Sequence, residues 1–109
     1  MTELELTNLE EEAETFYHGT RRDYLEEQLK KQGMYMHDNG NPVSISISEE
    51  FAMSIALKRA KDYKDLPDSD PVVLIIYGDK IRDKIYKTYR FSTCIDHLLQ
   101  DEFYVEIVE

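Results

Sequence analysis

The spacing of apolar residues predicts one helix early in the chain. Between Arg21 and Gln32 the apolar side chains recur at intervals that place them on one face of a helix. Gly33 follows directly, and glycine is the residue most often found just past a helix C-terminus. The short stretch Thr15–His18, ahead of this helix, predicts a strand.

After a turn-rich loop, the spacing of apolar residues changes from that of a helix to every second residue, as in a strand. The loop covers residues 34–42, where Asn, Asp, Gly and Pro gather. From Val43 to Ser48 apolar residues alternate with serines, which predicts a half-buried strand. Ser48 is a favourable N-cap, and helical spacing returns from there to Arg59.

The second half of the chain is predicted to consist mainly of strands. Residues 62–71 are polar and contain two prolines, which indicates a surface loop. Pro71–Tyr77 is almost continuously apolar, as expected of a central strand that is buried on both faces. Residues 86–91 predict a further strand, residues 95–99 one helical turn, and residues 103–108 a final strand.

Length and element order together predict one α+β domain over residues 15–109. A chain of 109 residues with 41% apolar content is large enough for a single compact core. Two helices near the start followed by a strand-rich half are typical of the α+β class. Residues 1–14 carry six glutamates and no basic residue, and we expect this acidic segment to be a tail or a short packed helix.

The net charge of −10 bears on the class of partner. Binding to nucleic acid depends largely on Lys and Arg that neutralise phosphates, so we expect no nucleic-acid partner. A basic protein partner is compatible with the charge. No apolar run approaches the roughly twenty residues that cross a bilayer, and the acidic N-terminal segment does not resemble a secretory signal, so no membrane partner is expected.

The single cysteine limits the chemistry further. Cys94 excludes an intramolecular disulfide and a cysteine-rich zinc site. We therefore expect a protein of the reducing cytoplasm that has no metal site. Both His37, in the turn-rich loop, and His97 are expected on the surface.

The tetrapeptide Tyr17-His18-Gly19-Thr20 is the first candidate site, where the first strand meets the helix. A neutral imidazole offers one donor and one acceptor to a sugar diol, and glycine lets a planar ligand approach the backbone closely. The motif therefore indicates a pocket for a sugar or amide ligand. The other interpretation is a turn in which His18 is a cap and Thr20 starts the helix.

Three segments, in their order and spacing, resemble the histidine-containing branch of the ADP-ribosyltransferase superfamily. They are the His-Gly-Thr motif at residues 18–20, the serine-bearing strand at residues 43–48 and the Gln-x-Glu motif at residues 100–102. The resemblance covers residues 15–108. It implies a small split β-sheet fold that binds NAD and transfers ADP-ribose to an acceptor, here a protein, with release of nicotinamide.

The resemblance also implies roles for individual residues. His18 is expected to bond a ribose hydroxyl of NAD, while Gly19 holds the nicotinamide amide beside Thr20. Ser44 stands where the family often has a tyrosine that stacks on nicotinamide. A serine has no aromatic face, so stacking would require another residue such as Tyr35 or Tyr63. An exposed serine face on an ordinary strand is the other interpretation.

The late carboxylate is the expected catalytic group. Cleavage of the nicotinamide bond builds positive charge on the ribose, and the resemblance implies that Glu102 stabilises it while Gln100 positions the acceptor. A polar turn leading into an edge strand is the other interpretation. Arg21, with Arg22, could contact the pyrophosphate from the helix start, or balance the acidic surface.

Two alternative functions remain open. The RNA 2′-phosphotransferases share the His-Gly-Thr motif, but the acidic composition disfavours an RNA substrate. A non-catalytic acidic interaction module on the same fold would instead bind or inhibit a basic, nucleic-acid-binding protein.

Overall fold

The computed structural model describes residues 8–37, 39–61, 69–88 and 93–108. The helices are α1 (Asn8–Glu12), α2 (Arg22–Gln32), α3 (Glu49–Lys61) and α4 (Gly78–Ile81). The strands are β1 (Thr15–Arg21), β2 (Met34–Tyr35), β3 (Val43–Ser44), β4 (Pro71–Tyr77), β5 (Tyr86–Lys87), β6 (Thr93–Ile95), β7 (Leu98–Leu99) and β8 (Phe103–Ile107). This part of the chain is an α+β domain, as the sequence predicts.

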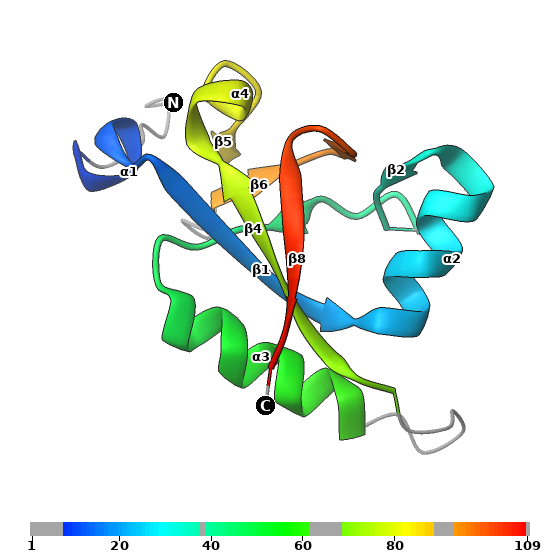
Figure 1. The fold of residues 1–109 in the computed structure, drawn as a ribbon. Helices are drawn as coiled ribbons and strands as arrows, with labels where there is room; N and C mark the ends of the chain where they lie inside the picture. The colour runs from blue at the N-terminus through cyan, green and yellow to red at the C-terminus, as the bar shows by residue number, and fades with distance from the viewer. Residues whose placement is uncertain (1–7, 38, 62–68, 89–92, 109) are drawn as a thin grey trace.

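The main sheet has the order β1-β4-β8, with both neighbours antiparallel to the central strand β4 (Figure 1). Its register with β1 runs from Thr15 opposite Tyr77 to Arg21 opposite Pro71. Two small sheets, β2-β7 and β3-β6-β5, form a second layer. A single bridge between Tyr17 and Ser46 connects β1 to the segment that follows β3.

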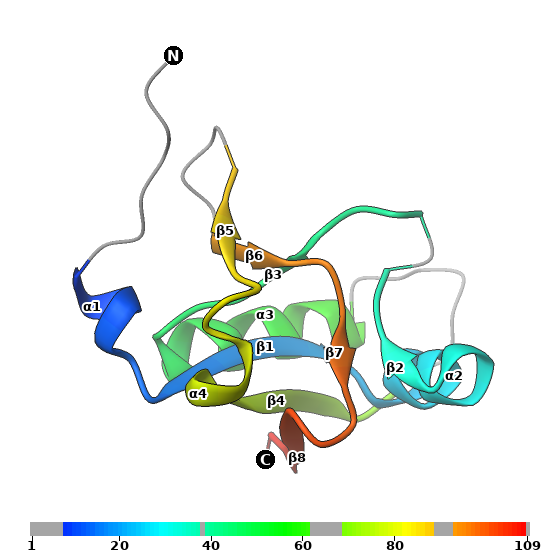
Figure 2. The same ribbon diagram turned by 90° about the horizontal axis from the view of Figure 1, so that it is seen from above.

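The main sheet lies between two different layers, as the two views together show (Figures 1 and 2). Helix α3 packs against β1 and β4 on one face. The larger core lies on the other face and includes Tyr35, Ile95 and Leu98 from the small sheets. Alternate residues of β4 enter the two cores, which explains why its sequence is apolar without interruption.

Gly19 is the point of closest approach between β1 and α3. A Cβ atom built on Gly19 would lie 2.7 Å from the backbone nitrogen of Ala56 and closer still to the carbonyl oxygen of Ala52. Both are backbone atoms of α3, so a change of side-chain rotamer could not relieve the clash. The absence of a side chain at Gly19 thus sets the distance between helix and sheet.

Several predicted boundaries are confirmed by local hydrogen bonds. Gly33 ends α2 in the left-handed conformation, with φ of 71°, and its N–H donates to the carbonyl of Leu29 at 2.9 Å. Ser48 caps α3, because its hydroxyl accepts the N–H of Phe51 at 3.2 Å.

Other predictions near the first motif require correction. The first strand extends to Arg21, so the tetrapeptide lies inside β1, and α2 begins at Arg22. Thr20 consequently does not start a helix. The strand predicted at residues 43–48 is regular only at Val43–Ser44, although Ile45 N–H still donates to Thr93 O at 2.9 Å.

The short strands of the second layer differ most from the predictions. The loop at residues 34–42 contains β2, and the helical turn predicted at residues 95–99 is wrong, because β6 ends and β7 begins there. Among the described strands, β2 and β7 pair with each other alone, across a long sequence separation that local spacing does not reveal. Three predicted segments lie partly outside the described residues. These parts are residues 62–68 of the surface loop, residues 89–91 of the strand predicted at 86–91, and residues 1–7 of the acidic segment.

We expect Gly19→Ala to lower the free energy of unfolding by about 3 kcal/mol, since the new methyl group would collide with the α3 backbone. Urea unfolding measures this. Gly40→Ala is the matched control: Gly40 has φ of 76° but no heavy atom within 4 Å of the added Cβ, so only backbone strain of about 1 kcal/mol is expected. Equal effects of the two substitutions would contradict the steric explanation.

Candidate functional site

A pocket of about 620 Å³ lies where β1 ends. Its walls come from the end of β1, the first turns of α2, the segment before β3 and the last turn of α3. All the lining residues except Pro42 are polar or aromatic, and they include Tyr24, His37, Asn39, Asn41, Ser44 and Arg59. The volume is within the range typical of small-molecule and cofactor sites, about 300–1,000 Å³.

His18 lies buried beneath this pocket, with both ring nitrogens engaged. Nδ1 donates to the carbonyl of Ser44 at 2.6 Å, because a carbonyl can only accept. Nε2 lies 2.9 Å from the Tyr35 hydroxyl, which is itself 3.1 Å from the Thr20 hydroxyl. His18 therefore connects β1 to both small sheets through polar contacts.

The imidazole of His18 is neutral at physiological pH. Burial, followed by the nearby positive charge of Arg59, lowers its pKa from 6.5 to about 3, against the opposite effect of the bond to Ser44. Arg59 Nη1 lies 3.4 Å from Nε2, as expected if that nitrogen has no proton. The ring thus has Nδ1 as its donor and Nε2 as its acceptor.

Arg59 reaches the backbone of the motif from α3. Its Nη1 donates to the carbonyl of Gly19 at 2.8 Å. The edge of β1 that faces away from β4 is the one where Tyr17 exchanges backbone hydrogen bonds with Ser46. Backbone groups alternate between the two edges of a strand, so the N–H and C=O of Gly19, two residues later, point to the same edge, beside Arg59.

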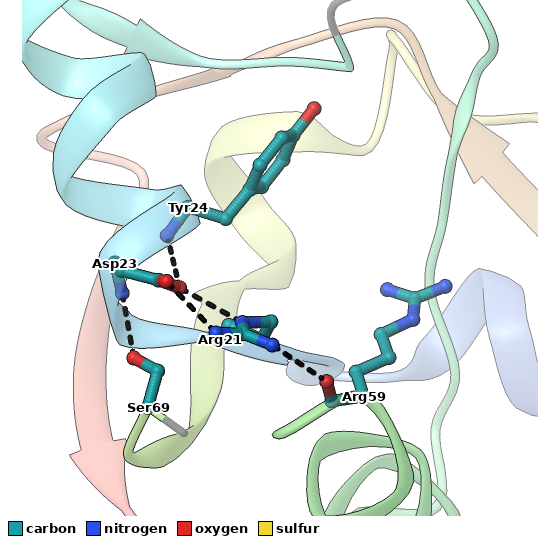
Figure 3. Close-up of polar contacts among 5 residues, drawn as sticks. All are labelled: Arg21, Asp23, Tyr24, Arg59 and Ser69. Carbon is teal, nitrogen blue, oxygen red and sulfur yellow. Dashed lines mark hydrogen bonds and ion pairs between the residues drawn. The ribbon is translucent and has the colours of Figure 1, made fainter. Parts of the chain in front are cut away.

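Arg21 is neutralised by its neighbour, as Figure 3 shows. Its guanidinium group donates to both carboxylate oxygens of Asp23, at 3.0 and 2.9 Å, and to the carbonyl of Arg59 at 3.5 Å. The hydrogen bond from Arg21 is the main cause that lowers the pKa of Asp23. Although Arg21 lines the pocket, its charge is already matched, whereas Arg59 lies at the pocket with its guanidinium on a neutral carbonyl.

The structure places Glu102 and Gln100 at the other end of the main sheet. The buried carboxylate of Glu102 forms an ion pair with Lys84 and accepts the N–H of Leu99 at 2.8 Å. Its backbone carbonyl accepts the N–H of Tyr77, the residue opposite Thr15. Because the pocket lies at the Arg21 end of β1, the seven-residue strand, about 20 Å long, separates the two regions.

Gln100 is exposed, and its side-chain amide donates to the carbonyl of Gly33 at 3.0 Å. The structure therefore brings together His18, Thr20, Arg21 and Ser44, with Gly19 on the adjoining edge, and leaves Gln100 and Glu102 apart from them. Neither of the two lines the pocket.

The aromatic environment differs from the predicted one. His37, expected on the surface, is partly buried, and its ring centroid lies 5.9 Å from that of His18 and 6.0 Å from that of Tyr24. Tyr35 is fully buried under His18. Tyr24 and His37 therefore provide the aromatic groups of the pocket, while Tyr63 lies outside the described residues.

Sequence reasoning also missed Arg59 as a site residue. One signal in the sequence could have identified it: Arg59 has the helical spacing that places it on the same face of α3 as Ala52 and Ala56, which are buried. A cation on the apolar face of a helix needs a polar partner, and here that partner is Gly19 O.

The sequence matches no protein-family model, and no curated protein matches it. Within the described ranges, no three His, Cys, Asp or Glu side chains are grouped so that they could hold a metal ion. No helix in the described part of the chain has the length and apolar character needed to cross a membrane. The chemistry of the pocket therefore has to support any functional conclusion.

The depressed pKa of His18 predicts a pH-dependent stability. Below pH 6.5 the unfolded chain binds a proton at this residue that the folded protein excludes down to about pH 3. The stabilisation that neutral His18 gives the folded protein is thus complete above pH 6.5. Below pH 6.5 the free energy of unfolding should fall by about 1.4 kcal/mol per pH unit.

Urea unfolding between pH 7 and pH 5.5 tests this expectation. His18→Gln should flatten the dependence, while the control His97→Gln, at a partly buried residue outside the pocket, should preserve it. An unchanged slope in His18→Gln would show that other groups cause it.

Proposed function

We propose that this protein binds NAD in the pocket at the end of β1 and is an ADP-ribosyltransferase-type domain. The observation that supports it best is the position of Arg59, a cation in an acidic protein, at the backbone of the glycine in a His-Gly-Thr motif. Amide and diphosphate groups are the parts of NAD that such a pair would recognise.

Each part of NAD has a matching group in or beside the pocket. The Gly19 N–H, at a strand edge, suits the carboxamide of nicotinamide, and its C=O does so when Arg59 moves from it to the diphosphate. Tyr24 and His37 offer ring faces to a base. His18 Nε2 can bond a ribose hydroxyl if that hydroxyl replaces Tyr35 as its partner.

The arrangement of the sheets supports the same assignment. The main sheet and the β3-β6-β5 sheet are joined through the Tyr17–Ser46 bridge beside His18, and we propose that they correspond to the two halves of the split β-sheet fold. Ser44, in strand β3 of the second of these sheets, is a lining residue of the pocket.

In the proposed reaction the bond between the ribose and nicotinamide breaks, and nicotinamide leaves with the bonding electrons. A nucleophile of a protein acceptor forms the new bond to the ribose and loses its proton. Glu102 is the proposed carboxylate that stabilises the ribosyl cation, with Gln100 directing the acceptor. This role requires Glu102 to release Lys84 and Leu99 when NAD binds, and its segment to move toward the pocket.

A second candidate function follows from that requirement. With Glu102 held by internal partners away from the pocket, the domain would bind its ligand without transferring ADP-ribose, and would act as an acidic module for a basic, nucleic-acid-binding protein.

We expect Arg59→Ala to weaken NAD binding by about tenfold or more, because one charge-assisted contact contributes roughly 1.5–3 kcal/mol. Calorimetric titration measures the Kd. Lys58→Ala is the matched control, since it removes an exposed cation one residue away. If the wild-type protein does not bind NAD, the proposed function is wrong.

We expect Glu102→Gln to abolish release of nicotinamide from NAD while NAD binding persists, because the amide fills the same space without the charge. Chromatography of the reaction detects nicotinamide. Glu27→Gln, at a carboxylate that lines the pocket, is the comparison. Loss of release in Glu27→Gln alone would reassign the catalytic carboxylate, and absence of release from the wild type despite binding would favour the module.

A further inference from the structure

Strand β8 forms an outer edge of the main sheet. The order β1-β4-β8 leaves it paired on one side with β4, and no described strand pairs with its other side. Figure 2 shows β8, in red, beyond β4 on the side away from β1. An edge strand presents backbone N–H and C=O groups that can pair with an added strand.

The flanking hydrogen bonds establish which residues have outward-pointing backbone groups. Tyr77 N–H donates to Glu102 O at 2.9 Å, and Val108 N–H donates to Pro71 O at 2.8 Å. Residues alternate in direction along a strand, so Tyr104 and Glu106 bond to β4. The backbone groups of Phe103, Val105 and Ile107 therefore point to the open side.

The side chains of β8 do not protect this edge. Val105 is 41% exposed and Ile107 50% exposed, although both are apolar. Natural edge strands are usually shielded by Lys, Pro or a bulge, and Phe103–Ile107 contains neither of these residues. An exposed apolar edge of this kind is suited to binding.

The opposite face of β8 is aromatic and acidic. Tyr104 and Tyr77 are 45% and 42% exposed, and their ring centroids lie 5.7 Å apart. Glu106 follows Tyr104 on the same face, and partial burial together with the negative charges of Glu106 and Glu49 raises the pKa of the Tyr104 hydroxyl. Lys80, whose Nζ lies 5.4 Å from the Tyr77 ring centroid, is the cation at this side. Aromatic rings beside carboxylates favour Lys and Arg side chains.

We propose that the open edge of β8 binds an extended, basic segment of a partner protein as an additional strand of the main sheet. Apolar residues of the segment pack on Val105 and Ile107, and the alternate Lys or Arg residues lie over Tyr104 and Glu106. This is β-strand addition, in which backbone hydrogen bonds give affinity and alternate side chains give specificity.

A second copy of this chain is a poorer occupant. Each copy has a net charge of −10, which opposes self-association. The edge of β8 is also separate from the pocket, since β4 lies between β8 and β1. The inference is therefore independent of NAD binding, and it gives the interaction-module function a specific surface.

Val105→Pro tests the edge directly. Proline removes the outward N–H of Val105 without deleting a hydrogen bond to β4, and proline is tolerated at such edge positions. Val105→Thr is the matched control, because it keeps the N–H and the branched shape. The probe is a fluorescent peptide of about eight residues in which valine alternates with lysine, and the measurement is its fluorescence anisotropy.

We expect the peptide to bind the wild type and Val105→Thr, and to bind Val105→Pro about tenfold more weakly or worse. A peptide with glutamate in place of lysine should not bind. Glu106→Lys should also weaken binding, in contrast to Glu12→Lys, which changes the net charge equally at an exposed residue of α1. These two variants keep the test valid if Val105→Pro fails to fold.

Four results would overturn the proposal. They are no binding of the lysine peptide, equal binding to a folded Val105→Pro, preference for the glutamate peptide, or a wild-type dimer in sedimentation that Val105→Pro dissociates. The last result would assign the edge to a second copy. Calorimetry with NAD should give the same Kd for wild type and Val105→Pro. A negative result with the peptides therefore does not bear on the proposal that the protein binds NAD.

Discussion

The close contact between β1 and α3 at Gly19 positions the groups around the pocket. Since no side chain intervenes, the helix backbone lies directly against the strand, and the last turn of α3 reaches the end of β1. That geometry brings the Arg59 guanidinium to the Gly19 carbonyl. The same glycine that is proposed to contact the ligand is thus required for packing of the helix.

The opposite face of β1 depends on a buried polar network. His18 bonds to Ser44 and Tyr35, and Tyr35 bonds to Thr20, so that the two small sheets are attached to the main sheet by hydrogen bonds as well as by apolar contact. Among the described residues, no buried side-chain nitrogen or oxygen lacks a partner. Such a network is favourable only when complete, and a neutral His18 completes this one.

Local charge matters more here than net charge. The protein is strongly acidic, yet Arg21 and Arg59 both line its pocket. Asp23 already balances Arg21, which leaves Arg59 as the cation best placed for an anionic ligand. The separation between this pocket and Glu102 is the constraint that distinguishes a transferase from a binding module, because catalysis requires a carboxylate beside the ribose.

The sequence by itself determined the elements whose signals are local. Periodic apolar spacing predicted α2 and α3, Gly33 and Ser48 marked helix ends, and the unbroken apolar run predicted β4. Of the His-Gly-Thr motif, Thr20 lines the pocket, and His18 bonds to the lining residue Ser44. Only the tertiary structure decided the two-residue strands, the turn wrongly predicted at residues 95–99, the inclusion of Arg59 and His37, and the distant position of Glu102. These features arise from pairing and packing between residues far apart in the chain, and neither hydrophobic period nor motif spacing contains that information.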